Sequence, residues 1–487
     1  MLEKCQSLET IEIPSFFTKI MKSSFNGCKY LTKVLLPDSV TEIGDYAFND
    51  CISLNEIEIP SSVTSIGKYS FCGCSNLCLF SIPLSVTTIG DYAFKNCGFE
   101  IIIVPSSVVS FGKFVFSECI RLYMCNPLSF MNEIPYGIFS NCINLRTFEI
   151  FYSMLSIGDY AFNGCSQLSV LEIPSSVKNI GSYSFCNCSG ITEIKIPSSV
   201  TTIGKYAFKN CTKIKEFDIP DSVVSVDEGA FYGCNSLKKV KLSSSIKEFK
   251  DFFFQYCESL EFFTKIESIN SVPNSFLCGC VLISEFTIPP SVKTIGNSSF
   301  EGCINLTKMI IPPSVTSIGD YCFYGCISLE EVSIPDSVTS IGKHCFRQCF
   351  KLASLKLPPL LEIIEQSSFY ECKSLNEIEI PDSVKVIDEF SFYRCYGLHR
   401  IIIHNSVISI FHFAFGMCSS LVDVSLPCSL MKIGKKAFDG CTKLKSISIP
   451  TNVNPIRELF YPVPHPAIPD VDHEFLGIPL DAKITLI

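Results

Sequence analysis

A cysteine recurs about every 23 residues along most of this chain of 487 residues. Of 28 cysteines, twenty form this column; eighteen of the nineteen intervals are 23 residues and one is 22. A phenylalanine stands three residues before most of them, as at Phe25 and Phe438. Such a period predicts a repeat array rather than the roughly three globular domains usual for this length. The column comprises Cys5, Cys28, Cys51, Cys74, Cys97, Cys119, Cys142, Cys165, Cys188, Cys211, Cys234, Cys257, Cys280, Cys303, Cys326, Cys349, Cys372, Cys395, Cys418 and Cys441.

The residue pattern of each repeat predicts two short strands followed by a turn. The clearest copy, LNEIEIPDSVKVIDEFSFYRC, runs from Leu375 to Cys395. In L-x-x-I-x-I the apolar residues alternate around Glu379, which is typical of a half-buried strand. The proline that follows, here Pro381, lacks an amide donor and ends the strand. The next segment, S-V-x-x-I-G, predicts a second extended piece with an inward pair such as Val63 and Ile66.

The remaining segment, A-F-x-G-C, predicts a tight turn. A small residue such as Ala47 precedes most of the phenylalanines, which indicates close packing at that position. Gly, Asn or Asp precedes most of the cysteines, as at Gly73 and Asn96, which suits a left-handed conformation. One unit of 23 residues cannot bury its own apolar edge. We therefore expect the units to stack at the strand spacing of about 4.8 Å, with the phenylalanines as an internal spine.

These motifs carry a family resemblance. The pattern L-x-x-I-x-I-P-x-S-V-x-x-I-G-x-x-A-F-x-x-C resembles the BspA-type leucine-rich repeat. The resemblance implies a β-rich leucine-rich-repeat solenoid of about 20 repeats of 23 residues. It further implies a right-handed superhelix with a parallel sheet on the concave face and short strands and turns on the convex side. The family includes surface antigens and adhesins that bind host proteins.

The repeat sets the expected domain boundaries. It extends over residues 1–461, where Tyr461 takes the phenylalanine position. Residues 462–487 lose the period and become rich in proline, but they keep apolar residues such as Phe475 and Leu476. We expect this non-repeat tail to dock over the last coil as a C-terminal cap.

Composition limits the class of partner and the location. Hydrophobic residues make up 47% of the chain and charged residues 18%, so a large core must form. The formal charge of −9 argues against a nucleic-acid partner. The sequence contains no stretch of 18 or more apolar residues, so it predicts no transmembrane helix. The N-terminal residues do not have the pattern of a signal peptide. These absences predict a cytoplasmic protein with reduced thiols, whereas the family resemblance favours the cell surface.

The cysteine column and the histidines indicate no catalytic, metal or cofactor site. A zinc site needs four converging thiolates, whereas one cysteine per coil places each thiol beside only two neighbours. Buried free thiols are the simpler interpretation, with Cys322 and Cys345 as the best pair for oxidation. His399, His404 and His412 lie within two repeats but in different columns. No nucleophile or phosphate-binding motif occurs, so the sequence predicts a protein that is not an enzyme.

The sequence does predict a surface for binding a protein partner. The third and fifth residues of each L-x-x-I-x-I strand should face outward, and most of them are polar. An exception is a group of apolar residues that should lie together on the concave face and mark an interaction site. We therefore predict a protein-binding scaffold, or alternatively a cell-surface adhesin or antigen. The candidate partner-binding residues are Leu79, Ile101, Ile103 and Met124, bordered by Glu149, Val170 and Glu172.

Overall fold

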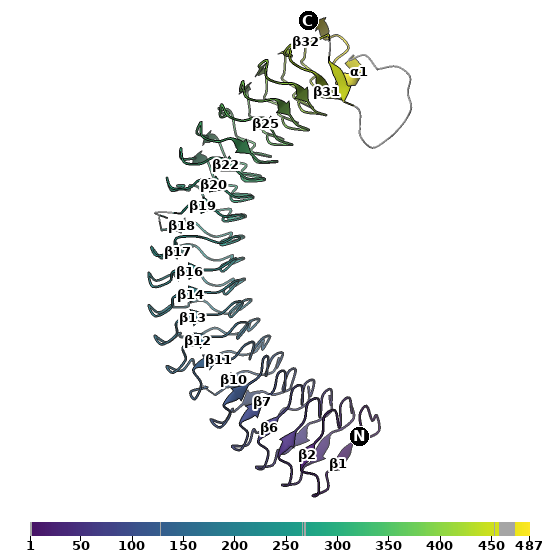
Figure 1. Cartoon of the computed structure of the whole chain (residues 1–487), viewed down its shortest axis with the longest axis vertical. Coiled ribbons are helices and arrows are strands. Elements are labelled where there is room, and N and C mark those ends of the chain that lie inside the picture. The colour runs from purple at the N-terminus through teal and green to yellow at the C-terminus, as the bar shows by residue number, and fades with distance from the viewer. Residues whose placement is uncertain (1, 127, 265, 267–268, 452, 457–472) are drawn as a thin grey trace. The chain divides into compact units, whose positions relative to one another are not determined.

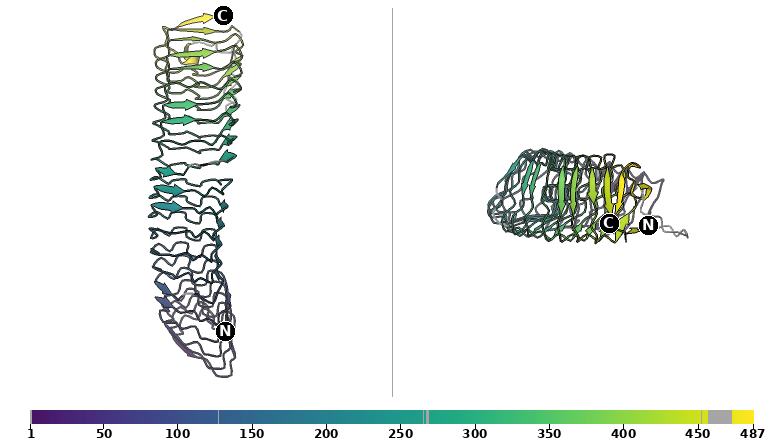
Figure 2. Two further views of the ribbon diagram at one scale, coloured as in Figure 1. Left: turned by 90° about the vertical axis from the view of Figure 1, so that its left-hand side faces the viewer. Right: turned by 90° about the horizontal axis from the view of Figure 1, so that it is seen from above.

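The computed structural model describes residues 2–126, 128–264, 266, 269–451, 453–456 and 473–487. The chain divides into two units, Met1–Ile246 and Lys247–Ile487. Each unit is a stack of coils in which parallel strands of neighbouring coils lie side by side (Figures 1 and 2). The predicted leucine-rich-repeat solenoid of 23-residue repeats is therefore confirmed. The right-handed sense of the superhelix and the position of one parallel sheet on its concave face stay predictions.

The L-x-x-I-x-I segments form what we call the first ladder. Its partners are one repeat apart, as in the pair Thr10 and Lys33 and the pair Glu377 and Arg400. In the first unit its strands are β1 (Thr10–Glu12), β3 (Lys33–Leu35), β5 (Glu56–Ile57), β8 (Ile101–Ile102), β10 (Met124–Cys125), β15 (Glu216–Asp218) and β17 (Lys239–Lys241). In the second unit they are β18 (Phe262–Phe263), β21 (Lys308–Ile310), β23 (Glu331–Ser333), β26 (Glu377–Ile380), β28 (Arg400–Ile403), β30 (Asp423–Ser425), β32 (Ser446–Ile449) and β34 (Lys483–Leu486).

The S-V-x-x-I segments form the second ladder, which also consists of parallel strands. In the first unit it is interrupted once, between β9 and β11. The strands there are β2 (Lys19–Ile20), β4 (Glu42–Ile43), β6 (Ser65–Ile66), β7 (Thr88–Ile89), β9 (Ser110–Phe111), β11 (Glu133–Ile134), β12 (Ser156–Ile157), β13 (Asn179–Ile180), β14 (Thr202–Ile203) and β16 (Ser225–Val226). Those of the second unit are β19 (Ser271–Val272), β20 (Thr294–Ile295), β22 (Ser317–Ile318), β24 (Ser340–Ile341), β25 (Ile363–Ile364), β27 (Val386–Ile387), β29 (Ser409–Ile410), β31 (Lys432–Gly434) and β33 (Asn454–Ile456).

The phenylalanine column forms the core of each unit. Phe208 in the first unit and Phe323 in the second are fully buried. The rings stack on those of neighbouring coils, with centroids 5.5 Å apart for Phe185 and Phe208 and 5.4 Å apart for Phe300 and Phe323. The predicted internal spine is confirmed in both units.

The cysteine column is buried beside the spine and bonds to the backbone. From Cys28 onward, most of these thiols donate a hydrogen bond to a carbonyl oxygen of the preceding coil, such as that of Phe25 for Cys51, at 3.1 Å. The same contact recurs in the second unit, where Cys349 bonds the carbonyl oxygen of Phe323 at 3.2 Å. These cysteines therefore do more than fill space, because they add a second donor to buried carbonyl oxygens that also accept a backbone amide, as that of Phe25 does from Cys28 at 3.0 Å.

The turn before each cysteine has the predicted left-handed backbone, with φ of 54° at Asp50 and 80° at Gly73. A second left-handed column, which the sequence did not indicate, carries bulky aromatic residues. Tyr46 and Tyr69 have φ of 56° and 54°, and their ring centroids lie 4.9 Å apart. Ring stacking between coils stabilises a conformation that is unfavourable for a single bulky residue.

The described residues of the tail pack onto the last coils of the second unit. Strand β34 pairs in parallel with β32, and the short helix α1 (His473–Leu476) precedes it. Leu476 is fully buried, and its carbonyl oxygen accepts a hydrogen bond from the amide of Phe438 at 3.1 Å. The predicted boundary at residues 461 and 462 lies outside the described residues. We propose that the tail caps the stack.

Candidate partner-binding site

Five apolar side chains, which we call the apolar patch, are exposed on the first ladder of the first unit. They are Leu79 at 84%, Ile101 at 38%, Ile103 at 67%, Met124 at 44% and Val170 at 67% relative exposure. On β8 and β10 the buried residues Ile102 and Cys125 follow the exposed Ile101 and Met124, so the outward direction of these two follows from the pleat of the strands. Each is at the third or fifth position of its repeat, where the sequence analysis places outward residues.

Strand pairing brings two patch residues next to each other. Ile101 on β8 is the direct partner of Met124 on β10. Leu79 occupies the corresponding position of the preceding coil. Val170 is separated from Met124 by one coil, in which Thr147 takes this position and forms a bridge to Val170. Four apolar residues of the patch therefore lie on three successive coils, with Val170 beyond Thr147.

An open groove with a volume of about 1020 Å³ adjoins the patch. Leu79 and Ile101 line this groove together with Leu35 and Phe80. Leu35 is 48% exposed, and it extends the apolar surface toward the N-terminal coils. The sequence analysis did not single out Leu35, although its outward position in the repeat was a usable signal.

The groove lies where the first ladder opens. Among the described residues, the segment 78–82 forms no strand, and its amides donate no backbone hydrogen bond to a neighbouring coil. Phe80 occupies the inward position that Ile57 takes one repeat earlier. Its ring packs among the core rings, 5.4 Å from that of Phe71 and 5.0 Å from that of Phe94.

Acidic side chains border the patch and the groove. Glu149 and Glu172, both predicted as bordering residues, are exposed on the two coils that contain Thr147 and Val170. The structure adds Glu58 and Glu100, which are exposed and line the groove. The sequence analysis did not assign these two carboxylates to the patch; Glu58 is at the fifth position of its repeat and Glu100 at the second.

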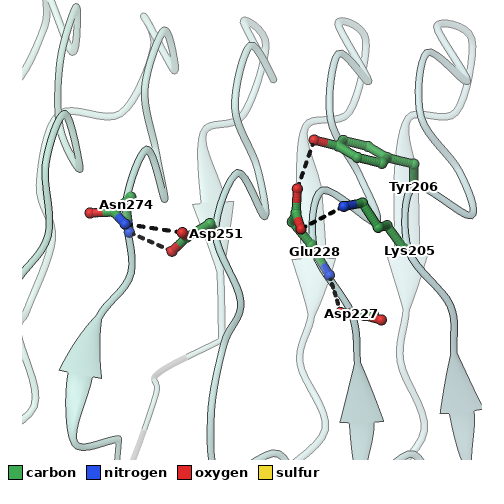
Figure 3. A network of polar contacts seen from close by, with 6 residues as sticks. All are labelled: Lys205, Tyr206, Asp227, Glu228, Asp251 and Asn274. Carbon is green, nitrogen blue, oxygen red and sulfur yellow. Dashed lines mark hydrogen bonds and ion pairs between the residues drawn. The ribbon is translucent and has the colours of Figure 1, made fainter.

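Polar side chains in the turn segments that follow the second ladder form contacts between adjacent coils. In the first unit, Glu228 accepts hydrogen bonds from Lys205 Nζ at 2.8 Å and from Tyr206 Oη at 3.1 Å (Figure 3). Burial and Glu228 raise the pKa of Tyr206. In the second unit, Asp251 accepts bonds from the amide and the side chain of Asn274 at 2.9 and 3.0 Å. These contacts join residues of adjacent coils and satisfy one another, so they give no sign of a reactive group.

The histidines and thiols are distributed rather than clustered. His404 Nε2 lies 3.1 Å from Glu379 Oε1, whereas His412 Nδ1 lies 3.3 Å from Glu389 Oε1. Among the described residues, no group of three or more His, Cys, Asp or Glu could hold a metal ion.

The pair singled out for oxidation lies together inside the second unit. Cys322 and Cys345 are both fully buried free thiols. Burial raises the pKa of Cys322, and a hydrogen bond with Cys345 adds to the effect. Both thiols are therefore shielded from reagents in solution while the unit is folded.

The geometry defines a repeat solenoid whose exposed strands and groove form a preformed surface. The family model of the BspA type leucine rich repeat region matches residues 1–123, 132–261, 270–369 and 339–462, so the chain belongs to this family. No curated protein matches the chain significantly. Within the part of the chain that the structure describes, no helix has the length and apolar character that crossing a membrane requires.

Several solved structures match the chain at low identity. A leucine-rich repeat protein from Bacteroides ovatus is 24% identical, with 98% of this chain and 92% of that chain covered and a TM-score of 0.42. A leucine rich cell surface protein from Faecalibacterium prausnitzii is 27% identical over 67% of this chain and 87% of that chain, with a TM-score of 0.42. The pneumococcal vaccine antigen PcpA is 21% identical over 69% and 74%, with a TM-score of 0.43.

Proposed function

We propose that this protein is a non-enzymatic scaffold that binds a protein partner through the exposed face of its first ladder, centred on the apolar patch. The observation that carries the proposal is the exposure of Leu79, Ile101, Ile103 and Met124 on three successive coils. Contiguous exposed apolar side chains mark interaction sites more often than isolated ones do. Tyr123, which is 39% exposed, adds an aromatic residue of the kind enriched at protein interfaces.

The architecture supports binding rather than catalysis. Backbone hydrogen bonds between coils hold the strands in place, so little ordering is required when a partner binds. Stacked repeats also create the extended surfaces that solenoid proteins use for recognition. Burial raises the pKa of column thiols such as Cys51, to about 12, so these thiols are protonated and poorly nucleophilic at neutral pH.

Removing the centre of the patch tests this function. Short peptides displayed on phage are selected on the immobilised wild-type protein, and the enriched peptides are then synthesised and titrated. We expect the double variant Ile101→Ser and Ile103→Ser to lose at least about tenfold in affinity, which corresponds to about 1.4 kcal/mol. The melting temperature should change little, because Ile103 is 67% exposed and Ile101 is 38% exposed.

A matched control separates the patch from surface apolarity in general. Val109 and Val224 are 77% and 59% exposed in the same unit, but they follow the S-V dipeptide and lie off the first ladder. The double variant Val109→Ser and Val224→Ser should bind the selected peptides like the wild type. Equal binding by the wild type and the isoleucine variant would exclude the patch as the binding site.

A second candidate is an adhesin or antigen displayed on the cell surface, which membership of the BspA-type family favours. Protease treatment of intact source cells should then release peptides of this chain before peptides of a cytoplasmic marker. Protection of the chain until the cells are lysed would reject surface display and leave the scaffold function intact.

A further inference from the structure

Carboxylates without ion-pair partners surround the apolar patch. Glu58, Glu100, Glu149 and Glu172 are all exposed, and none of them forms an ion pair among the described residues. Elsewhere on the first ladder of the same unit, acidic residues do pair. Glu56 lies 2.5 Å from Lys33 Nζ, and Glu216 lies 3.6 Å from Lys239 Nζ.

The groove has the same charge bias. Its lining includes Asp38, Glu58 and Glu100 but no lysine, arginine or histidine. The neighbouring coils contribute two arginines, of which Arg121 donates a hydrogen bond to Cys78 Sγ at 3.3 Å. Arg146 precedes Thr147 and is exposed. The surface thus combines an apolar centre with an excess of negative charge that the unit itself does not neutralise.

We propose that the partner presents a segment in which apolar side chains are accompanied by lysine or arginine. The apolar side chains contact Leu79, Ile101 and Met124, and the basic groups face the bordering carboxylates. This inference rests on the proposed function and specifies the chemistry of its partner. Complementary charges at an interface accelerate association and reject wrong partners, whereas each exposed pair adds little to the affinity.

Three synthetic peptides of equal length test the inference directly. They share the same leucines and differ only in having Lys, Glu or Ser at the remaining positions. We expect the Lys peptide to bind the wild-type protein at least about tenfold more tightly than the Glu peptide, equivalent to about 1.4 kcal/mol. The difference should shrink in about 1 M salt, where the Debye length falls to about 3 Å.

Variants of the bordering carboxylates identify the source of the preference. Replacing Glu58, Glu100, Glu149 and Glu172 together by Gln should abolish the preference for Lys over Glu. As a control, Glu193→Gln and Glu216→Gln change exposed carboxylates of the same face outside the patch and should preserve it. Because all six side chains are exposed, none of these changes should lower the melting temperature.

The outcomes separate this inference from the proposed function. If all three peptides bind equally and lose affinity in the Ile101→Ser and Ile103→Ser variant, the patch binds partners but the charge inference is wrong. A preference for Lys that survives in the quadruple Gln variant also overturns the inference. Failure of all three peptides to bind contradicts both. A concentration-dependent dimer in sedimentation that the isoleucine variant abolishes would identify a second copy of the chain as the occupant instead.

Discussion

The Sγ atom of Cys74 lies 3.2 Å from the carbonyl oxygen of Phe48, which belongs to the preceding coil. Both residues are fully buried, so no water is available to this carbonyl group. The contact explains why the column consists of cysteine rather than alanine, because a thiol is small and apolar yet can still donate a weak hydrogen bond.

Substitution of this thiol should therefore destabilise the first unit. Cys74→Ala removes one of the two donors to the carbonyl oxygen of Phe48, which keeps the amide of Cys51 at 3.3 Å, and we expect the free energy of unfolding to fall by about 0.5–1.5 kcal/mol. Denaturation by guanidinium chloride measures the loss. Cys428→Ala, at an exposed cysteine, is the control and should change nothing measurable. Equal stability of the Cys74 variant and the wild type would show that the contact is dispensable.

The buried thiols predict a loss of stability at alkaline pH. Burial raises the pKa of Cys51, Cys119 and Cys441 to about 12, from an ordinary value of 9.0. Below pH 9.0 the thiols are protonated in both states, so their contribution to stability is fully present. Above it, the unfolded chain releases protons that the folded chain retains. The free energy of unfolding should fall by about 1.4 kcal/mol per pH unit for each such thiol.

Denaturation curves recorded from neutral pH to about pH 11 check this dependence. The variant Cys51→Ala removes one titrating thiol and should show a shallower decline than the wild type. A constant free energy of unfolding across this range would contradict the assignment of the column thiols as buried and protonated.

Truncation of one spine residue should be costly. Phe208→Ala removes a fully buried ring that stacks between those of Phe185 and Phe231. We expect a loss of about 3–5 kcal/mol in the free energy of unfolding, because the rigid stack cannot collapse into the cavity. Phe16, which is 76% exposed, provides the control, since Phe16→Ala should change stability by less than about 0.5 kcal/mol. Similar losses in both variants would argue against a continuous spine.

The proposed cap can be tested at Leu476. A charge at this fully buried position should release the tail from the last coils, lower the melting temperature and expose strand edges that promote aggregation. Thermal unfolding and light scattering of Leu476→Asp measure both effects. Leu480→Asp changes a residue that is 89% exposed in the same segment and should leave both properties unchanged. A melting temperature unaffected by Leu476→Asp would mean that the tail has no capping role.

The sequence predicts much of the fold because most core contacts join equivalent residues one repeat apart. Phe208 contacts the equivalent residues of the adjacent coils, so a column in the sequence becomes a column in space. The left-handed backbone at Gly73 was equally predictable, because glycine favours that conformation. Tyr206 was not, because its φ of 52° is unusual for a bulky residue, and the tilted ring contact with Tyr183 that stabilises it is a tertiary contact.

The candidate site likewise contains residues that the sequence could identify and a groove that it could not. Its outward apolar residues, such as Ile103, could be identified from the alternation of the strand alone. The groove could not, because its lining residues, such as Leu35, Phe80 and Ile101, come from different coils and only the folded structure brings them together.

By itself, the sequence determined the 23-residue stacking unit, the aromatic core and the side chains that face solvent, because periodicity and pleating are local properties. Only the tertiary structure decided where the ladder opens and which carboxylates lack a cation. Both depend on the volume and charge that adjacent coils bring together. Glu56 and Glu58 occupy the two outward positions of the same repeat, yet Lys33 pairs with Glu56 alone.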